Sequence, residues 1–208
     1  MKPTLIIFVK EPRPGRVKTR LARNVGAVAA ALWYRRQCAA LLRRLGQDRR
    51  WRTVLAVSPD TAVRSPCWPP GLRRIQQGRG TLGARMARAL SAASPGPVLL
   101  IGSDVPRIGP NDIAAAFAAL RGAGAVLGPS GDGGFWLIGL AQGKRLPRGR
   151  ADGVGSGSTG PLEPVRWSSP HALKDTVTRL RPLSVSYTAT RDDVDEFADL
   201  TRLGLPRP

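Results

Sequence analysis

The sequence has few of the features that mark secreted or membrane-bound proteins. Its 208 residues include only two cysteines, Cys38 and Cys67, which form neither a metal-spaced pair nor a disulfide framework. No apolar run is long enough to span a bilayer, and the short apolar stretch near the N-terminus is followed at once by charge, unlike a signal peptide. We therefore expect reduced thiols, no membrane span and a cytoplasmic location.

Acidic residues are also scarce. The chain has 33 basic and 14 acidic residues, a net charge of +19 and a pI of about 11.7. This balance favours polyanions, whether nucleic acid, anionic lipid or phosphate-bearing small molecules, although arginines spread over the whole chain are equally consistent with a compositional habit of the genome. The sequence lacks an interleaved aromatic stacking surface, which argues against a nucleic-acid partner despite the charge.

Apolar runs and helical periodicities alternate along the chain. The runs predict strands over 5–9, 53–57, 72–75, 97–101 and 125–127, and the 3.6-residue spacings predict helices over 25–45, 82–92 and 112–120. Such alternation is typical of a largely parallel sheet between helices. We predict one α/β domain over residues 1–208, with ligands bound beyond the carboxyl ends of the strands.

The first strand runs directly into a basic loop. Five basic residues lie between positions 10 and 20, with Gly15 among them and a helix soon after. Backbone N–H groups and cationic side chains that converge between a strand and a helix form a phosphate-binding arrangement. A solvated basic turn is the alternative.

Acidic residues follow two other strands. Asp104 comes just after the strand over 97–101, where a carboxylate suits Mg²⁺; a turn or helix-cap role is the alternative. Near the C-terminus, five acids lie within eight positions, and Glu196 and Asp199 suit a helix start. Asp193 and Asp195 alternate in an extended segment, so their carboxylates point to one side and could complete a metal site with Asp104.

A glycine-rich turn, residues 128–134, presents Asp132 before an apolar run that begins with Phe135 and Trp136. A tight hairpin joining Val126 to Leu137 would explain some of these glycines. Four glycines in seven positions exceed that need, so we also predict close approach of the backbone to a bulky ligand such as a sugar or nucleoside.

These motifs, in this order, resemble a known family. Lys10 to Leu21, Gly102 to Pro106, Gly128 to Leu140 and Asp193 to Asp195 are similar to a bacterial family of small GT-A-type glycosyltransferases, long catalogued as a domain of unknown function and found near radical-SAM and arsenosugar pathways. That family is similar to 2-phospho-lactate guanylyltransferases and, more distantly, to molybdenum-cofactor guanylyltransferases. A further segment from Gln77 to Met86 also resembles it.

The resemblance implies a nucleotide-diphospho-sugar transferase fold, GT-A-like and Rossmann-like, and assigns roles to individual residues. The expected nucleotide-binding residues are Lys10, Gly15, Lys18, Thr19, Arg20, Gln77, Gly83 and Arg85. The expected catalytic residues are Asp104, Lys18 and Arg20, and Asp104, Asp193 and Asp195 would hold Mg²⁺ or Mn²⁺. The expected substrate-binding residues are Asp132, Gly133, Gly134, Trp136 and Trp167.

The implied activity is metal-dependent transfer from a nucleotide-activated donor to a small-molecule acceptor. A glycosyltransferase that uses a nucleotide sugar fits best; a nucleotidyltransferase that joins an NTP to a small phosphorylated acceptor is the alternative, and a non-catalytic polyanion-binding protein is a weaker one. The sequence departs from the family at Thr81, where an aspartate is usual, and over residues 143–164, which are rich in Gly, Ser and Arg. We expect that segment to be flexible and to act on the acceptor, or else to be a tolerated surface insertion.

Overall fold

A computed structural model describes residues 1–93, 95–147 and 160–207. The strands are β1 (Thr4–Lys10), β2 (Arg52–Ser58), β3 (Arg73–Gln76), β4 (Val98–Ile101), β5 (Ala125–Pro129), β6 (Phe135–Leu140) and β7 (Val185–Tyr187). The helices are α1 (Thr19–Val25), α2 (Ala27–Leu45), α3 (Leu82–Ser91), α4 (Pro110–Ala119), α5 (Ala172–Leu180) and α6 (Phe197–Arg202), with a 3-10 turn at Asp60–Arg64. Within the helix predicted over 25–45, Gly26 with φ +85° separates α1 from α2.

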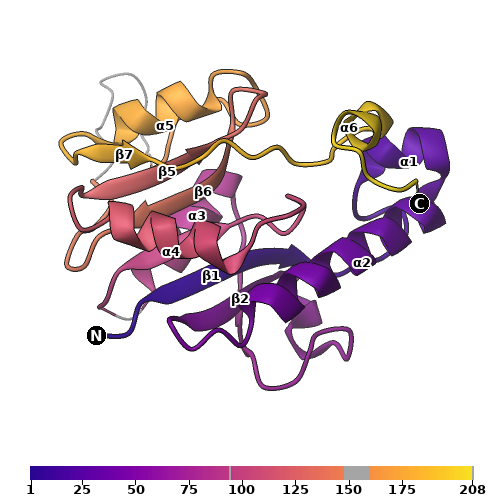
Figure 1. The fold of residues 1–208 in the computed structure, drawn as a ribbon, viewed down its shortest axis with the longest axis horizontal. Helices are drawn as coiled ribbons and strands as arrows, with labels where there is room; N and C mark the ends of the chain where they lie inside the picture. The colour runs from indigo at the N-terminus through magenta and orange to yellow at the C-terminus, as the bar shows by residue number, and fades with distance from the viewer. Residues whose placement is uncertain (94, 148–159, 208) are drawn as a thin grey trace.

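The strands form one seven-stranded sheet in the order β3-β2-β1-β4-β6-β5-β7. Among the described strands only β6 is antiparallel to its neighbours, because it returns from β5 as a hairpin and inserts between β4 and β5. The predicted α/β fold with a mostly parallel sheet is confirmed. As a result, the carboxyl ends of β1, β4, β5 and β7 and the start of β6 meet at one edge of the sheet (Figure 1).

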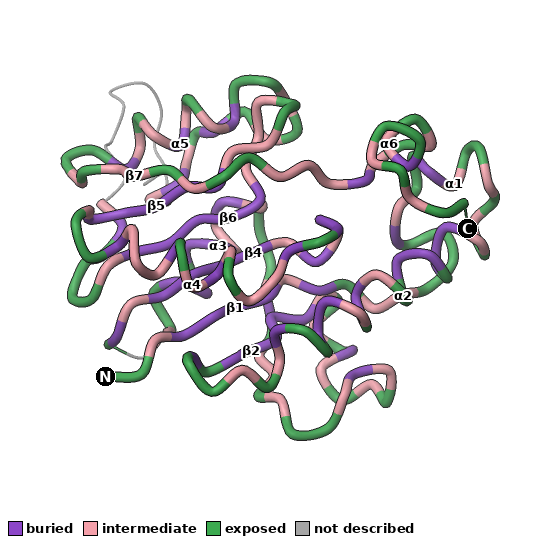
Figure 2. Tube along the Cα trace, in the orientation of Figure 1, coloured by how far each residue is buried: buried purple, intermediate pink, exposed green. Residues whose placement is uncertain are grey.

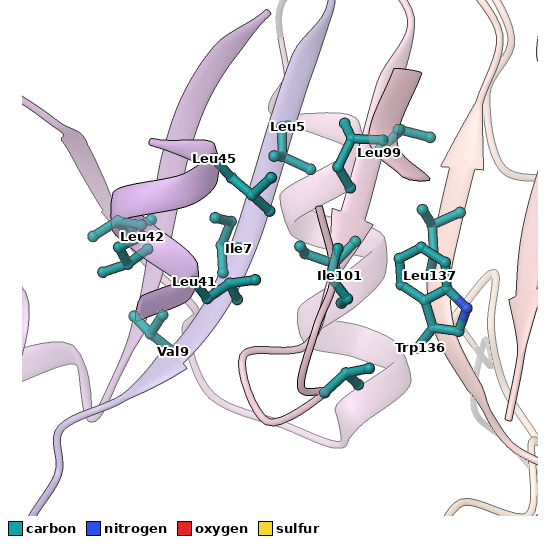
Figure 3. Packing of buried hydrophobic residues seen from close by; sticks show 14 of the residues in the cluster. Leu5, Ile7, Val9, Leu41, Leu42, Leu45, Leu99, Ile101, Trp136 and Leu137 are labelled. Carbon is teal, nitrogen blue, oxygen red and sulfur yellow. The ribbon is translucent and has the colours of Figure 1, made fainter. Parts of the chain in front are cut away.

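Helices cover both faces of the sheet, as the alternation of side chains along β1 requires. Leu5, Ile7 and Val9 point to the face that packs against α2 and α4 (Figure 3), whereas Ile6 points to the face covered by α3 and α5. Figure 2 shows that the central strands are buried along most of their length. The runs with little polar alternation in the sequence are therefore strands buried on both faces.

A third apolar cluster lies beyond the edge of the sheet, where α1 and α6 stand side by side (Figure 1). Val17 and Leu21 from the first loop and helix pack there against Val194 and Leu200 from the C-terminal segment. This cluster fixes the two chain segments that carry the basic loop and the acidic run.

The prediction of a flexible segment over 143–164 falls mostly on residues 148–159, which lie outside the described residues. At its described ends, Leu146 and Leu162 are buried against the α3 side of the sheet, and the Glu163 carboxylate accepts a hydrogen bond from the Thr81 hydroxyl at the start of α3. Both described ends of the segment are therefore anchored by a buried leucine. In the described ranges, no helix is long and apolar enough to cross a membrane.

Candidate active site

A cleft of about 580 Å³ opens at the edge where the strands end. Its walls combine charged groups with an apolar surface. The charged and polar lining includes Lys10, Lys18, Thr19, Arg20, Gln77, Arg85, Asp104, Asp132, Asp193 and Asp195; the apolar lining includes Phe8, Leu82, Met86, Leu100, Phe135, Trp136 and Trp167. The volume falls in the range usual for sites that bind nucleotide-sized molecules.

Three carboxylates converge in this cleft. Asp104 follows β4, and Asp193 and Asp195 come from the extended segment after β7; each residue offers an oxygen, and these ligand atoms lie within 4.8 Å of one another. The arrangement follows from the backbone, because Val194 between them is buried and its N–H donates to the Asp104 carbonyl at 3.3 Å. The two flanking carboxylates are thereby directed to the side of Asp104.

The ammonium of Lys18 lies within the same cluster. Its Nζ donates to Asp104 Oδ2 at 2.6 Å and to Asp195 Oδ1 at 2.8 Å, and the side chain is only 6% exposed. Burial alone would lower the pKa of Lys18, but the two carboxylates outweigh it and raise the pKa. Burial would likewise raise the pKa of Asp104, but Lys18 outweighs this effect and lowers it. Arg20 makes an exposed ion pair with Asp195 at 3.1 Å.

Asp193 differs from its two neighbours. Burial, followed by the charge of Asp104, raises the pKa of the Asp193 carboxyl to about 7, although Lys18 opposes this shift. The ionised form of a carboxyl in such surroundings is stabilised by a nearby cation more strongly than that of an exposed carboxyl. The hard oxygens of the three carboxylates and their close spacing suit Mg²⁺ or Mn²⁺, so the residues present fit the predicted metal.

A buried hydrogen-bond chain supports the loop that carries Asp104. The Lys10 backbone N–H donates to the Tyr34 hydroxyl at 2.9 Å, and that hydroxyl is 2.7 Å from Ser103 Oγ. Tyr34 thus ties the end of β1 to the residue before Asp104. Neither Tyr34 nor Ser103 was predicted as a site residue, because no sequence signal pairs a tyrosine with a serine 69 residues away.

Gln77 and Arg85 lie together on the α3 side of the cleft. Gln77 is 4% exposed, and its Nε2 donates to the carbonyls of Val9 and Ala56 at 3.2 and 2.8 Å. Its Oε1 accepts from Arg85 Nη1 at 2.9 Å. Both N–H donors of the Gln77 amide are therefore used by protein groups, and in this pair it is the Arg85 guanidinium that retains N–H donors for a ligand.

The glycine-rich turn forms the predicted hairpin between β5 and β6. Gly133 has φ +83°, and a Cβ there would overlap the Pro170 carbonyl, while a Cβ at Gly128 would overlap the Trp136 ring. Contacts within the protein therefore account for Gly128 and Gly133 without a ligand, and the close approach of a bulky ligand to this turn stays a prediction. Asp132 and Gly134 line the cleft.

The predicted substrate-binding aromatics lie in different surroundings. Trp136 is 3% exposed, belongs to the main core (Figure 3) and donates its indole N–H to the Ala189 carbonyl at 3.0 Å, so it touches the cleft only from the core. Trp167 is partly exposed in the cleft and meets Phe135 edge to face, with ring centroids 6.1 Å apart. Gly15, Gly83 and Gly133 are not among the described residues that line the cleft.

Comparison with known families agrees with this geometry. The model of the family described as "Uncharacterized protein conserved in bacteria (DUF2064)" matches residues 41–169. The chain belongs to this family. The DUF2064 match covers β2 to β6 and Asp104, whereas β1, Lys18, Asp193 and Asp195 lie outside the matched range. A comparison with curated proteins gives no match.

Solved structures share the fold. A protein from Desulfovibrio desulfuricans G20, provisionally assigned as a nucleotide-diphospho-sugar transferase, is 28% identical over 97% of this DUF2064 chain and 86% of its own, with a TM-score of 0.84. The manganese complex of Rv0371c from Mycobacterium tuberculosis H37Rv has a TM-score of 0.52 at 14% identity, over 98% of each chain. 4-Diphosphocytidyl-2C-methyl-D-erythritol synthase from Anaerococcus prevotii DSM 20548 has a TM-score of 0.54 at 11% identity, over 96% of this chain and 95% of that one. The fold is that of the nucleotide-diphospho-sugar transferases.

Proposed function

We propose that this protein is a metal-dependent transferase that binds a nucleotide-activated donor, and that it acts as a glycosyltransferase on a nucleotide sugar. The observation that carries the proposal is the convergence of Asp104, Asp193 and Asp195, with Lys18 among them, on the wall of an open cleft. The similarity to a provisionally assigned nucleotide-diphospho-sugar transferase and to a manganese-bound structure supports it.

The chain's own residues suit glycosyl transfer. A bond forms between an acceptor oxygen and the sugar's anomeric carbon while the bond between that carbon and the donor phosphate oxygen breaks, and negative charge grows on the departing nucleoside diphosphate. Lys18 and Arg20 line the cleft, as Lys10 does, and could hydrogen-bond those oxygens. Mg²⁺ or Mn²⁺, held by the three aspartates, would supply the remaining charge stabilisation when bound.

The acceptor would lie on the β5–β6 side of the cleft. Asp132, which is exposed and lines the cleft, is placed to orient an acceptor hydroxyl and take its proton. Phe135 and Trp167 give an apolar wall beside it, which suits the face of a sugar ring or another flat group.

A nucleotidyltransferase is the second candidate, and Arg85 favours it. Two of the five guanidinium N–H donors of Arg85 go to Gln77 and to the Thr81 carbonyl, and no described carboxylate pairs with it. A cation of this kind, on a different element from Lys18 and Arg20, suits a second anionic group such as the phosphate of an acceptor.

A thermal-shift screen of nucleotides and nucleotide sugars, with and without Mn²⁺, tests the proposal because a bound ligand raises the apparent stability by mass action. We expect stabilisation by nucleoside diphosphates or their sugars that depends on Mn²⁺. Release of a nucleoside diphosphate on turnover would identify a glycosyltransferase, and release of pyrophosphate a nucleotidyltransferase. If no nucleotide stabilises the protein with or without metal, the proposal fails.

A further inference from the structure

Lys18 occupies an unusual position for a residue expected to bind a donor phosphate. Its ammonium donates to Asp104 and Asp195, which are two of the three residues that could hold a metal. The side chain is 6% exposed, whereas those of its two partners are 32% and 43% exposed. The cation therefore lies beneath the carboxylates that face the cleft.

From this geometry we propose that Lys18 and the divalent metal compete for the same carboxylates, so that Lys18 sets the metal affinity and couples metal binding to donor binding. The inference rests on the proposed function, since it takes the carboxylate cluster to be a metal site. The inference adds a step to the role of Lys18: metal binding releases its ammonium from the carboxylates, and the ammonium can then bind the donor diphosphate.

Electrostatics makes the two cations alternatives. A divalent ion such as Mg²⁺, if held by these carboxylates, would lie about 2.1 Å from their oxygens. An ammonium that still donated to the same groups would then lie only a few ångströms from the ion, with little water to screen the repulsion. The carboxylates would also be polarised toward the ion and would be poorer acceptors. Metal binding therefore requires the Lys18 ammonium to move away.

The first loop allows that movement without refolding. Val17, which precedes Lys18, is buried in the cluster between α1 and α6, and Lys18 itself has φ +47° and ψ +48° at the start of α1. The backbone is thus held in a left-handed conformation that few non-glycine residues adopt. The flexible four-carbon side chain beyond it can swing, and Lys18 lines the same cleft as Thr19 and Arg20.

A diphosphate in the cleft would give the displaced ammonium a new partner. Without a diphosphate, metal binding must break both ion pairs of Lys18 with no compensation; with one, the ammonium exchanges carboxylate oxygens for phosphate oxygens. Each ligand should then strengthen the binding of the other by the same factor. Lys18→Met, which keeps the length of the side chain and removes its charge, should weaken this coupling.

The test is calorimetric titration of Mn²⁺ into the whole protein, its Lys18→Met variant and its Arg20→Met variant. Arg20 is the matched control, because it also pairs with Asp195, at 3.1 Å, but with a side chain that is 51% exposed. We expect Lys18→Met to bind Mn²⁺ at least tenfold more tightly than the unmodified protein, and Arg20→Met less than threefold more tightly. At saturating Mn²⁺, Lys18→Met should bind GDP and UDP, used as probes, at least tenfold more weakly.

The opposite changes in metal and diphosphate affinity are the signature, because a loss of folding would weaken both. If Lys18→Met folds only with metal, its Mn²⁺ affinity can still be measured. The variant is refolded in Mn²⁺, and the metal is then withdrawn with increasing concentrations of a chelator. An equal gain in Mn²⁺ affinity in both variants would mean that only net charge matters. Unchanged Mn²⁺ affinity in Lys18→Met would mean that Lys18 and the metal do not compete. Either result overturns this inference but leaves the proposed function standing. If none of the three proteins binds Mn²⁺, the proposed function fails with it.

Discussion

The Gln77 side chain allows a sharp test of how the cleft is built. Replacing Gln77 by Leu keeps the approximate volume but removes the donors to the Val9 and Ala56 carbonyls and the acceptor for Arg85. Leaving a buried polar group unsatisfied costs about 1–3 kcal/mol. With two buried carbonyls affected, we expect Gln77→Leu to lower the free energy of unfolding by about 2–6 kcal/mol.

Arg85→Ala is the matched control, because it leaves the two Gln77 donor bonds in place and removes only the bonds that the partly exposed Arg85 side chain makes to Gln77 Oε1 and to the Thr81 carbonyl. It should lower the free energy of unfolding by about 1 kcal/mol or less. Urea unfolding followed by tryptophan fluorescence measures both values, provided that the denaturant slope is unchanged. An unfolding midpoint for Gln77→Leu that equals that of the unmodified protein would refute the assigned hydrogen bonds.

The same pair of variants separates a positioning role from direct contact with ligand. If Gln77 acts on nucleotide binding only by holding Arg85, Gln77→Leu should weaken the binding of GDP or UDP, but it should have no further effect when Arg85 is already alanine. Calorimetry on the two single variants and the double variant gives this cycle. Losses of affinity that add in full would show that Gln77 touches the nucleotide itself.

Three further predictions follow from the charged side of the cleft. Asp104→Asn should abolish Mn²⁺-dependent turnover while the circular dichroism spectrum stays unchanged; full activity would remove Asp104 from the metal site. Arg20→Ala should weaken donor binding by about 1–3 kcal/mol, the scale of one charge-assisted hydrogen bond, as measured by calorimetry. Because the pKa of Asp193 is raised to about 7, the folded state binds more protons than the unfolded state between about pH 4 and pH 7. Without metal, the free energy of unfolding should therefore fall as the pH rises through that window, by at most about 4 kcal/mol before solvent screening, and Asp193→Asn should remove this slope.

Sequence patterns were sufficient to predict which site residues lie together where the course of the backbone alone determines their positions. Asp104 follows a buried strand, and in a parallel sheet the ends of such strands share one edge, so its meeting with the segment after β7 could be predicted. The alternation of Asp193 and Asp195 predicted a common side in the same way. The order of the strands was not needed for either argument.

The sequence was insufficient where a side chain's partner lies far along the chain. Gln77 bonds to a carbonyl 68 residues away, and Tyr34 bonds to Ser103. Gly133 and Gly128 were attributed to a ligand because the sequence does not show that Pro170 and the Trp136 ring lie against them. In each case a local pattern identified an unusual residue, but only the packing shows which group accounts for it.

Two segments that are far apart in the sequence meet at the site, and this has a consequence for stability. Lys18 lies close to the N-terminus and Asp195 close to the C-terminus, and both segments are fixed by the cluster that contains Val17, Val194 and Leu200. This cluster stands apart from the two faces of the sheet, so its residues gain little from the main core. A ligand that joins the carboxylates would therefore add a second link between segments that a small apolar cluster otherwise holds together. Stabilisation by metal should accordingly be greatest in this region, where hydrogen exchange of α1 and α6 should slow more than that of the sheet.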